Sequence, residues 1–96
     1  AYINHLLAAG RAWGTVSQRV GHIRRLQLRH PDLLAVTTAD LEQYLAQLAR
    51  LDHEPETRKA FRSSMRAYYG WLHRTGQLDV DPAAPLRPIH VPHRPA

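Results

Sequence analysis

Apolar side chains recur along this chain at spacings of three and four residues, in four separate segments. The segments cover residues 2–9, 15–29, 37–51 and 56–75. Because residues three and four apart share one face of an α-helix, each segment predicts a helix with one apolar side. The sequence therefore predicts an all-α fold with four main helices.

Capping and turn residues mark where these helices begin and end. Thr37 precedes Asp40 by three residues, which is the spacing of a capping box at a helix N-terminus. Gly10 and Gly76 follow the first and last segments, and glycine commonly ends a helix because it adopts a left-handed backbone without strain. Residues 11–14 are expected to connect the first two helices.

The composition changes after the fourth helical segment. The last sixteen residues contain five prolines, so most of this stretch cannot be helical. Such a composition is typical of an extended linker. We therefore expect a helical domain over residues 1–81 and a proline-rich linker over residues 82–96 that leads to a further domain.

Length and composition narrow the possible functions. A chain of 96 residues has room for one modest core but not for an additional enclosed catalytic cleft, so we expect no enzyme activity in this chain. The absence of cysteine excludes disulfides and thiolate zinc sites, and we expect no cofactor. No apolar run reaches the roughly 18 residues of a membrane span, and no signal peptide is recognisable. We expect a cytoplasmic protein with no membrane partner.

The positive charge of the chain is concentrated in two of the four segments. Thirteen Lys and Arg against eight Asp and Glu give a net charge of +5. Five of the basic residues lie within residues 11–29 and five within residues 58–74, and neither stretch contains an acidic residue. Exposed helices usually mix both signs, so these stretches indicate a polyanionic partner, with nucleic acid ahead of an anionic membrane surface. A merely solvated basic face is the alternative interpretation.

On each of these two helices the basic residues form a stripe beside the apolar side. In the second helix the stripe comprises Gln18, His22, Arg25 and Arg29, with Arg19 and Arg24 at its borders. In the fourth helix it comprises Arg58, Arg62, Arg66, Tyr69 and His73, flanked by Lys59 and Ser63. A DNA major groove about 12 Å wide admits a helix, whose Arg and Lys contact phosphates while Gln, Ser or Arg reach base edges.

Several short motifs follow one another in a characteristic order and spacing. They are Thr37-x-x-Asp40-Leu41, Thr57 at the start of the last helix, Ser64-Met65-Arg66-x-Tyr68-Tyr69-x-Trp71-Leu72, and Gly76 followed by Asp81-Pro82-Ala83. Together they resemble the N-terminal core-binding (SAM-like) domain of tyrosine recombinases, the phage integrase and Xer recombinase family. The resemblance covers residues 2–86. It implies two roughly crossed helical hairpins that clamp DNA together with a separate catalytic domain.

The resemblance also implies a function, a set of partners and a set of contacts. The function is a sequence-specific DNA-binding module that grips the core recombination site through the major groove with the second and fourth helices, in the bacterial cytoplasm or nucleoid. The partners are double-stranded DNA, the protein's own catalytic domain and neighbouring recombinase protomers. The candidate contacts carried over by position are Gln18, Arg19, His22, Arg25, Lys59, Arg62, Ser63 and Arg66, and the basic stripes add Arg29, Arg58 and Tyr69. The chain departs from many relatives at Ala60 and Phe61, where they carry basic residues.

Two other functions stay open at this point. A SAM-like protein–protein interaction domain is expected to expose an apolar patch or a patch of opposite charges. A helix-turn-helix regulator needs a short turn before a recognition helix, and the turn before Glu56 is a candidate.

Some suggestive residues are assigned no chemistry. None of the four tyrosines is expected to be a catalytic nucleophile, and Tyr44 and Tyr68 fall on apolar helix faces. Residues 22–25 match the H-x-x-R pattern of the recombinase active site, but so short a pattern has a high false-positive rate, and we interpret them as a helix face. His90 and His93 are too few ligands for a metal site. Both tryptophans, Trp13 and Trp71, are expected to pack in the core or between helices.

Overall fold

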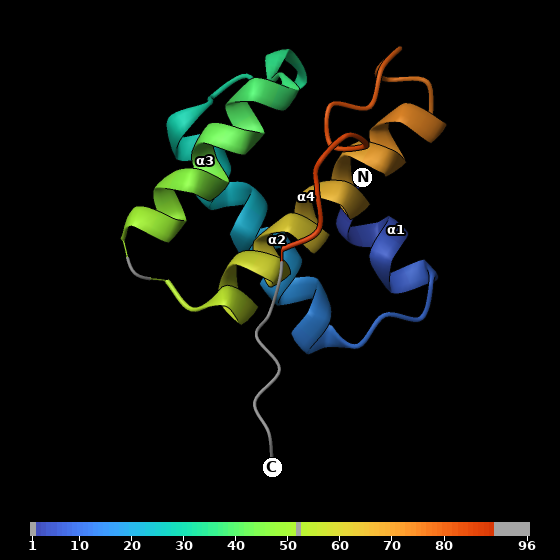
Figure 1. The fold of residues 1–96 in the computed structure, drawn as a ribbon. Coiled ribbons are helices and arrows are strands. Elements are labelled where there is room, and N and C mark those ends of the chain that lie inside the picture. Colours follow the sequence, from blue (N-terminus) through green and yellow to red (C-terminus); the bar gives the residue numbers. More distant parts are fainter. Residues whose placement is uncertain (1, 52, 90–96) are drawn as a thin grey trace.

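The computed structural model describes residues 2–51 and 53–89, and the regular secondary structure in these ranges is entirely helical, without strands. The elements are α1 (Tyr2–Ala8), α2 (Trp13–Arg29), the short 3₁₀ helix η1 (Leu33–Ala35), α3 (Thr38–Arg50) and α4 (Pro55–Arg74) (Figure 1). The all-α class and the four main helices are thereby confirmed.

The start of α2 differs most from the sequence-based expectation. Trp13 and Gly14 were expected in the connector but lie in the first turn of this helix. Ala12 occupies the N-cap position and makes no side-chain cap hydrogen bond. The start of α2 therefore lacks the Ser, Thr, Asp or Asn by which an N-terminus is recognised in a sequence.

The helix ends that carry recognisable caps are confirmed. At the start of α3, Thr37 Oγ1 accepts a hydrogen bond from the Asp40 backbone N–H at 3.2 Å, and the Thr37 N–H donates to Asp40 Oδ2 at 3.0 Å. After α4, Gly76 has a φ of 79°, and the N–H of Gln77 donates to the Leu72 carbonyl at 2.9 Å. These are a capping box and a Schellman C-cap, which satisfy backbone groups that a helix end leaves free.

The helices pack in pairs around α4. Helix α1 contacts α2, α3 contacts α4, and α2 contacts α4, which agrees with the two helical hairpins expected. A main core unites α2, α3 and α4, and a smaller cluster joins α1 to α2 and to the α4 residues Tyr68 and Trp71. The main core consists of Leu26, Val36, Leu41, Leu48, Phe61, Met65, Tyr69, Leu72, Ala83 and Leu86.

The segment after α4 folds back along that helix (Figure 1). Ala83 and Leu86 are buried in the main core, with 0% and 5% of their surfaces exposed. Thr38 Oγ1 also donates a hydrogen bond to the Pro82 carbonyl at 2.6 Å. The structure thus differs from the expected linker over residues 82–89, because proline prevents a helix but does not prevent apolar side chains between prolines from packing. The remainder of the expected linker, residues 90–96, lies outside the described residues.

Candidate nucleic-acid interface

The structure sorts the expected DNA contacts by their accessibility. Six of them are exposed: Gln18, Arg25, Arg29, Lys59, Ser63 and Arg66. Arg19 and Arg58 are half-buried, whereas His22, Arg62 and Tyr69 are buried. Only the first group is exposed to a partner.

A buried hydrogen bond joins the two basic helices. His22 Nδ1 of α2 lies 2.7 Å from Ser64 Oγ of α4, and the His22 ring stacks on the Phe61 ring with 3.9 Å between their centres. Gln18 and Arg25 lie about one helical turn to either side of His22. Ser63 is adjacent to Ser64 and exposed. Exposed polar residues of both helices therefore flank the same helix contact.

His22 itself does not lie in the exposed stripe expected from the sequence. Only 9% of its surface is exposed. Burial, with a smaller contribution from the Arg25 guanidinium, lowers the pKa of His22 below its ordinary value. A histidine with a lowered pKa is neutral at pH 7, so His22 joins the helices without adding charge.

Two arginines of α2, Arg25 and Arg29, extend toward α4 and α3. The guanidinium carbon of Arg25 lies 6.0 Å from the centre of the Phe61 ring, within the range of a cation–π contact. Arg29 Nη1 donates a hydrogen bond to Gln47 Oε1 of α3 at 2.6 Å. Burial raises the pKa of Tyr44, while Arg25 and Arg29 oppose that shift. Both arginines therefore lie near Tyr44 as well as on the exposed side of α2.

On α4 the basic stripe is only partly exposed. Arg66 and Lys59 face solvent, whereas Arg62 is 9% exposed and its Nη2 donates to the Leu86 carbonyl at 3.1 Å. Burial lowers the pKa of Arg62, and the nearby Arg66 adds to this effect. Arg62 thus holds the returning segment, residues 82–89, which runs back along α4. It does not lie in the open basic stripe that was expected from the sequence.

The expected place of Tyr69 on the exposed stripe is wrong. Its side chain is 0% exposed, and its hydroxyl donates a hydrogen bond to the Leu33 carbonyl of η1 at 2.8 Å. Burial raises the pKa of this hydroxyl. Tyr69 lies at the edge of the apolar side of α4. The periodicity of one helix does not reveal that η1 and the returning segment cover this edge.

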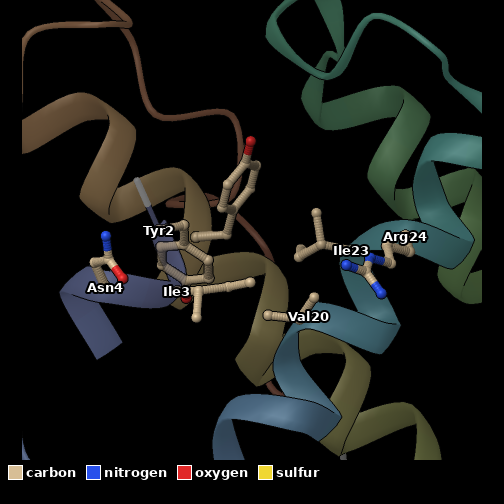
Figure 2. Close-up of a pocket in the computed structure, with 7 residues that line it drawn as sticks. Tyr2, Ile3, Asn4, Val20, Ile23 and Arg24 are labelled. Atoms are coloured by element: carbon tan, nitrogen blue, oxygen red, sulfur yellow. The ribbon is translucent and has the colours of Figure 1, made fainter. Parts of the chain in front are cut away.

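An apolar groove between α1, α2 and α4 was not expected from the sequence. The cavity has a volume of about 490 Å³ and is lined by Tyr2, Ile3, Asn4, Val20, Ile23, Arg24 and Tyr68 (Figure 2). A neighbouring cavity shares Ile3 and includes Trp13, which is 69% exposed although packing in the core or between helices was expected. Trp71, by contrast, is half-buried against the core as expected. The apolar residues of α1 are the feature of the sequence that relates to this groove. The same pattern is equally typical of a helix whose apolar side is fully covered.

Neither a metal centre nor a membrane span is found in the part of the chain that the structure describes. Residues 2–51 and 53–89 contain no group of three or more His, Cys, Asp or Glu arranged to hold a metal ion. Across the same residues, no helix combines the length and apolar character needed to cross a membrane. His90 and His93 lie outside the described residues.

Comparison with known proteins gives one informative similarity. The chain is 35% identical over 60 residues to tyrosine recombinase XerD of Xanthomonas axonopodis pv. citri (strain 306). The similarity covers 62% of this chain and 20% of that protein, so it spans about a fifth of the relative's length. No family model and no solved structure matches the chain. The similarity supports a relationship to the tyrosine recombinases.

Proposed function

We propose that this chain is a double-stranded DNA-binding module of a site-specific tyrosine recombinase or integrase. The observation that carries the proposal is the meeting of two basic segments, residues 11–29 and 58–74, which contain no acidic residue. The His22–Ser64 contact holds their helices together, with exposed polar side chains on both sides of it. The similarity to a tyrosine recombinase supports the same function.

In the proposed complex, α2 and α4 face the major groove of the core recombination site. Arg25, Lys59 and Arg66 neutralise phosphates, because these basic residues are exposed on the two helices. Gln18 and Ser63 carry donors and acceptors suited to base edges. The buried residues His22, Arg62 and Tyr69 support this surface from within and are not proposed as contacts.

The proposed module does not cut or join DNA by itself. The nucleophilic tyrosine and its Arg and His partners belong to a catalytic domain that this chain does not contain, and the partners in a synaptic complex are that domain and neighbouring protomers. This part of the proposal rests on the resemblance to core-binding domains.

A salt titration of DNA binding tests the proposal. If about five phosphates are neutralised, the slope of log K against log salt for duplex DNA should lie near −4 to −5. The measurement is a fluorescence-anisotropy titration with random-sequence duplex at several salt concentrations. Absence of binding, or an affinity that does not change with salt, contradicts the proposal.

The apolar groove favours a second candidate, a protein–protein interaction domain. Ile3 lines this groove and Trp13 lines the neighbouring cavity, and 40% and 69% of their surfaces are exposed. If interaction through this surface is the function, Ile3→Glu should abolish association while DNA is not bound by either form. Sedimentation of the parent and this variant, with and without duplex DNA, separates the two candidates.

A further inference from the structure

The segment after α4 brings one more arginine, Arg87, to the N-terminal half of α4. Figure 1 shows this segment running back along the helix, and the Arg62–Leu86 hydrogen bond of 3.1 Å fixes its position there. Leu86 is 5% exposed, and Arg87 follows it directly with an exposed side chain. The backbone at Arg87 is therefore held by its neighbour while its side chain is exposed.

Arg87 shares a cavity with a second arginine. A cavity of about 470 Å³ is bounded by Arg58 of α4, by Leu86 and Arg87 of the returning segment, and by residues of α3. Glu42 of α3 is the one acidic residue among those lining it. The two guanidinium groups thus outnumber the carboxylate, and the site is cationic.

Two guanidinium nitrogens beside this segment have no hydrogen-bond partner. Among the described residues, the Nε atoms of Arg58 and Arg62 are buried without an acceptor. Both Nε atoms are shielded from solvent, so an oxygen anion outside the protein can be bound only through the outer nitrogens of a guanidinium group. The planar guanidinium fork matches the geometry of a phosphate group. The local chemistry therefore suits a phosphate.

We infer that Arg87 and Arg58 bind one phosphate of the DNA backbone, and that Arg62 positions Arg87 by holding the Leu86 carbonyl. This inference rests on the proposed DNA-binding function. It extends the binding surface from the two basic helices to the segment that follows them. Arg62 acts through Arg87 and is a positioning residue.

Neutral substitutions at the two arginines test the contact. Arg87→Gln and Arg58→Gln should each make the slope of log K against log salt less negative by about 1. For one lost phosphate contact, the ratio of parent to variant affinity should differ about 3–4-fold between roughly 50 and 200 mM salt. The melting temperature of Arg87→Gln should match the parent, because its side chain is exposed. Arg50→Gln, at an exposed arginine of α3, is the matched control and should keep the parent slope.

A different result is expected if Arg87 serves only the fold. In that case it pairs with Glu42, and Arg87→Gln lowers the melting temperature while the salt slope equals that of the parent. That combination overturns the inference. The inference is also overturned if Arg87→Gln has both the salt slope and the melting temperature of the parent.

A double-variant comparison tests the positioning role of Arg62. Arg62→Gln should reduce the salt slope as much as Arg87→Gln does, and the double variant should lose no more than either single variant. Additive losses would show that Arg62 contacts DNA independently and overturn its positioning role.

If the parent does not bind duplex DNA, the proposed function fails. If the parent binds and Arg66→Ala or Arg25→Ala weakens it while Arg87→Gln does not, only this inference fails.

Discussion

His22 shows how a residue chosen for its charge acquires a structural role. In the sequence it stands in line with Gln18 and Arg25, and nothing in the pattern separates the three. In the structure it is buried between α2 and α4, stacked on Phe61 and hydrogen-bonded to Ser64. Because His22 lies at the contact between α2 and α4, its protonation state affects the stability of the fold.

Stability should depend on pH through His22. Burial and Arg25 lower the pKa of the folded-state imidazole below the ordinary value of about 6.5. Just below that pH the unfolded chain binds more protons than the folded one, so stability falls as pH falls from about 7 toward the lowered folded-state pKa. Thermal melts followed by circular dichroism should show this decrease for the parent. His22→Gln should melt at a lower temperature at pH 7.5 but with a flatter pH dependence, and parallel curves for the two proteins would contradict the prediction.

The Tyr69 hydroxyl provides a second test at the same scale. Tyr69→Phe removes the hydrogen bond to the Leu33 carbonyl and leaves the ring in the core. Loss of this bond should lower the free energy of unfolding by about 0.5–1.5 kcal/mol. Affinity for duplex DNA should stay at the parent value, since the hydroxyl faces η1. A weakened DNA affinity with unchanged stability would restore Tyr69 as a contact.

Among the elements, α4 combines a core side with a basic side. Phe61 is 1% exposed in the main core, whereas Arg66 of the same helix faces solvent. The two sides should respond to substitution in opposite ways.

Phe61→Ala should open a cavity and lower the free energy of unfolding by about 3–5 kcal/mol. Arg66→Ala should change stability by about 0.5 kcal/mol or less and yet weaken binding to all DNA sequences alike. Denaturant titrations and DNA titrations on the two variants measure both effects. Equal DNA affinity for Arg66→Ala and the parent would show that this side of α4 is only solvated.

Sequence patterns predicted local features of the elements better than contacts between them. The capping box at Thr37 and the glycine after α4 are local signals, since the groups that bond lie within a few residues of one another. Arg62 and Tyr69 lie at the edge of the apolar side of α4, where burial depends on elements distant in sequence. Their partners, Leu86 and Leu33, are 24 and 36 residues away. The spacing of apolar residues within α4 cannot show which distant residues cover Arg62 and Tyr69.

At the scale of the whole molecule, the main core extends past residue 81, the boundary expected from the sequence. The buried side chains of Ala83 and Leu86 complete the main core. A chain ending at residue 81 should therefore unfold more readily than one ending at residue 89. Removing Leu86 alone from the core should cost about 2–5 kcal/mol. Melting temperatures of the two truncated chains measure the difference, and equal values would place residues 82–89 outside the cooperative unit.

The proposed module should also be unable to cleave DNA strands. Tyr69 is fully buried, and Tyr2, Tyr44 and Tyr68 pack within or against the core clusters. Incubation with a nicked suicide substrate should leave no covalent protein–DNA adduct on a denaturing gel. A phosphotyrosine adduct at any of the four positions would overturn the assignment of chemistry to a separate domain.

The returning segment also determines how the molecule bears tension. Its attachments to the helices follow one another along the chain: Leu86 to Arg62, Ala83 in the core, then Pro82 to Thr38. A pull applied at residue 89 therefore loads these attachments one after another, as in unzipping, before it reaches the end of α4. The segment should detach at a lower force than the helices, so that residues 82–89 can be released while α2 and α4 stay folded.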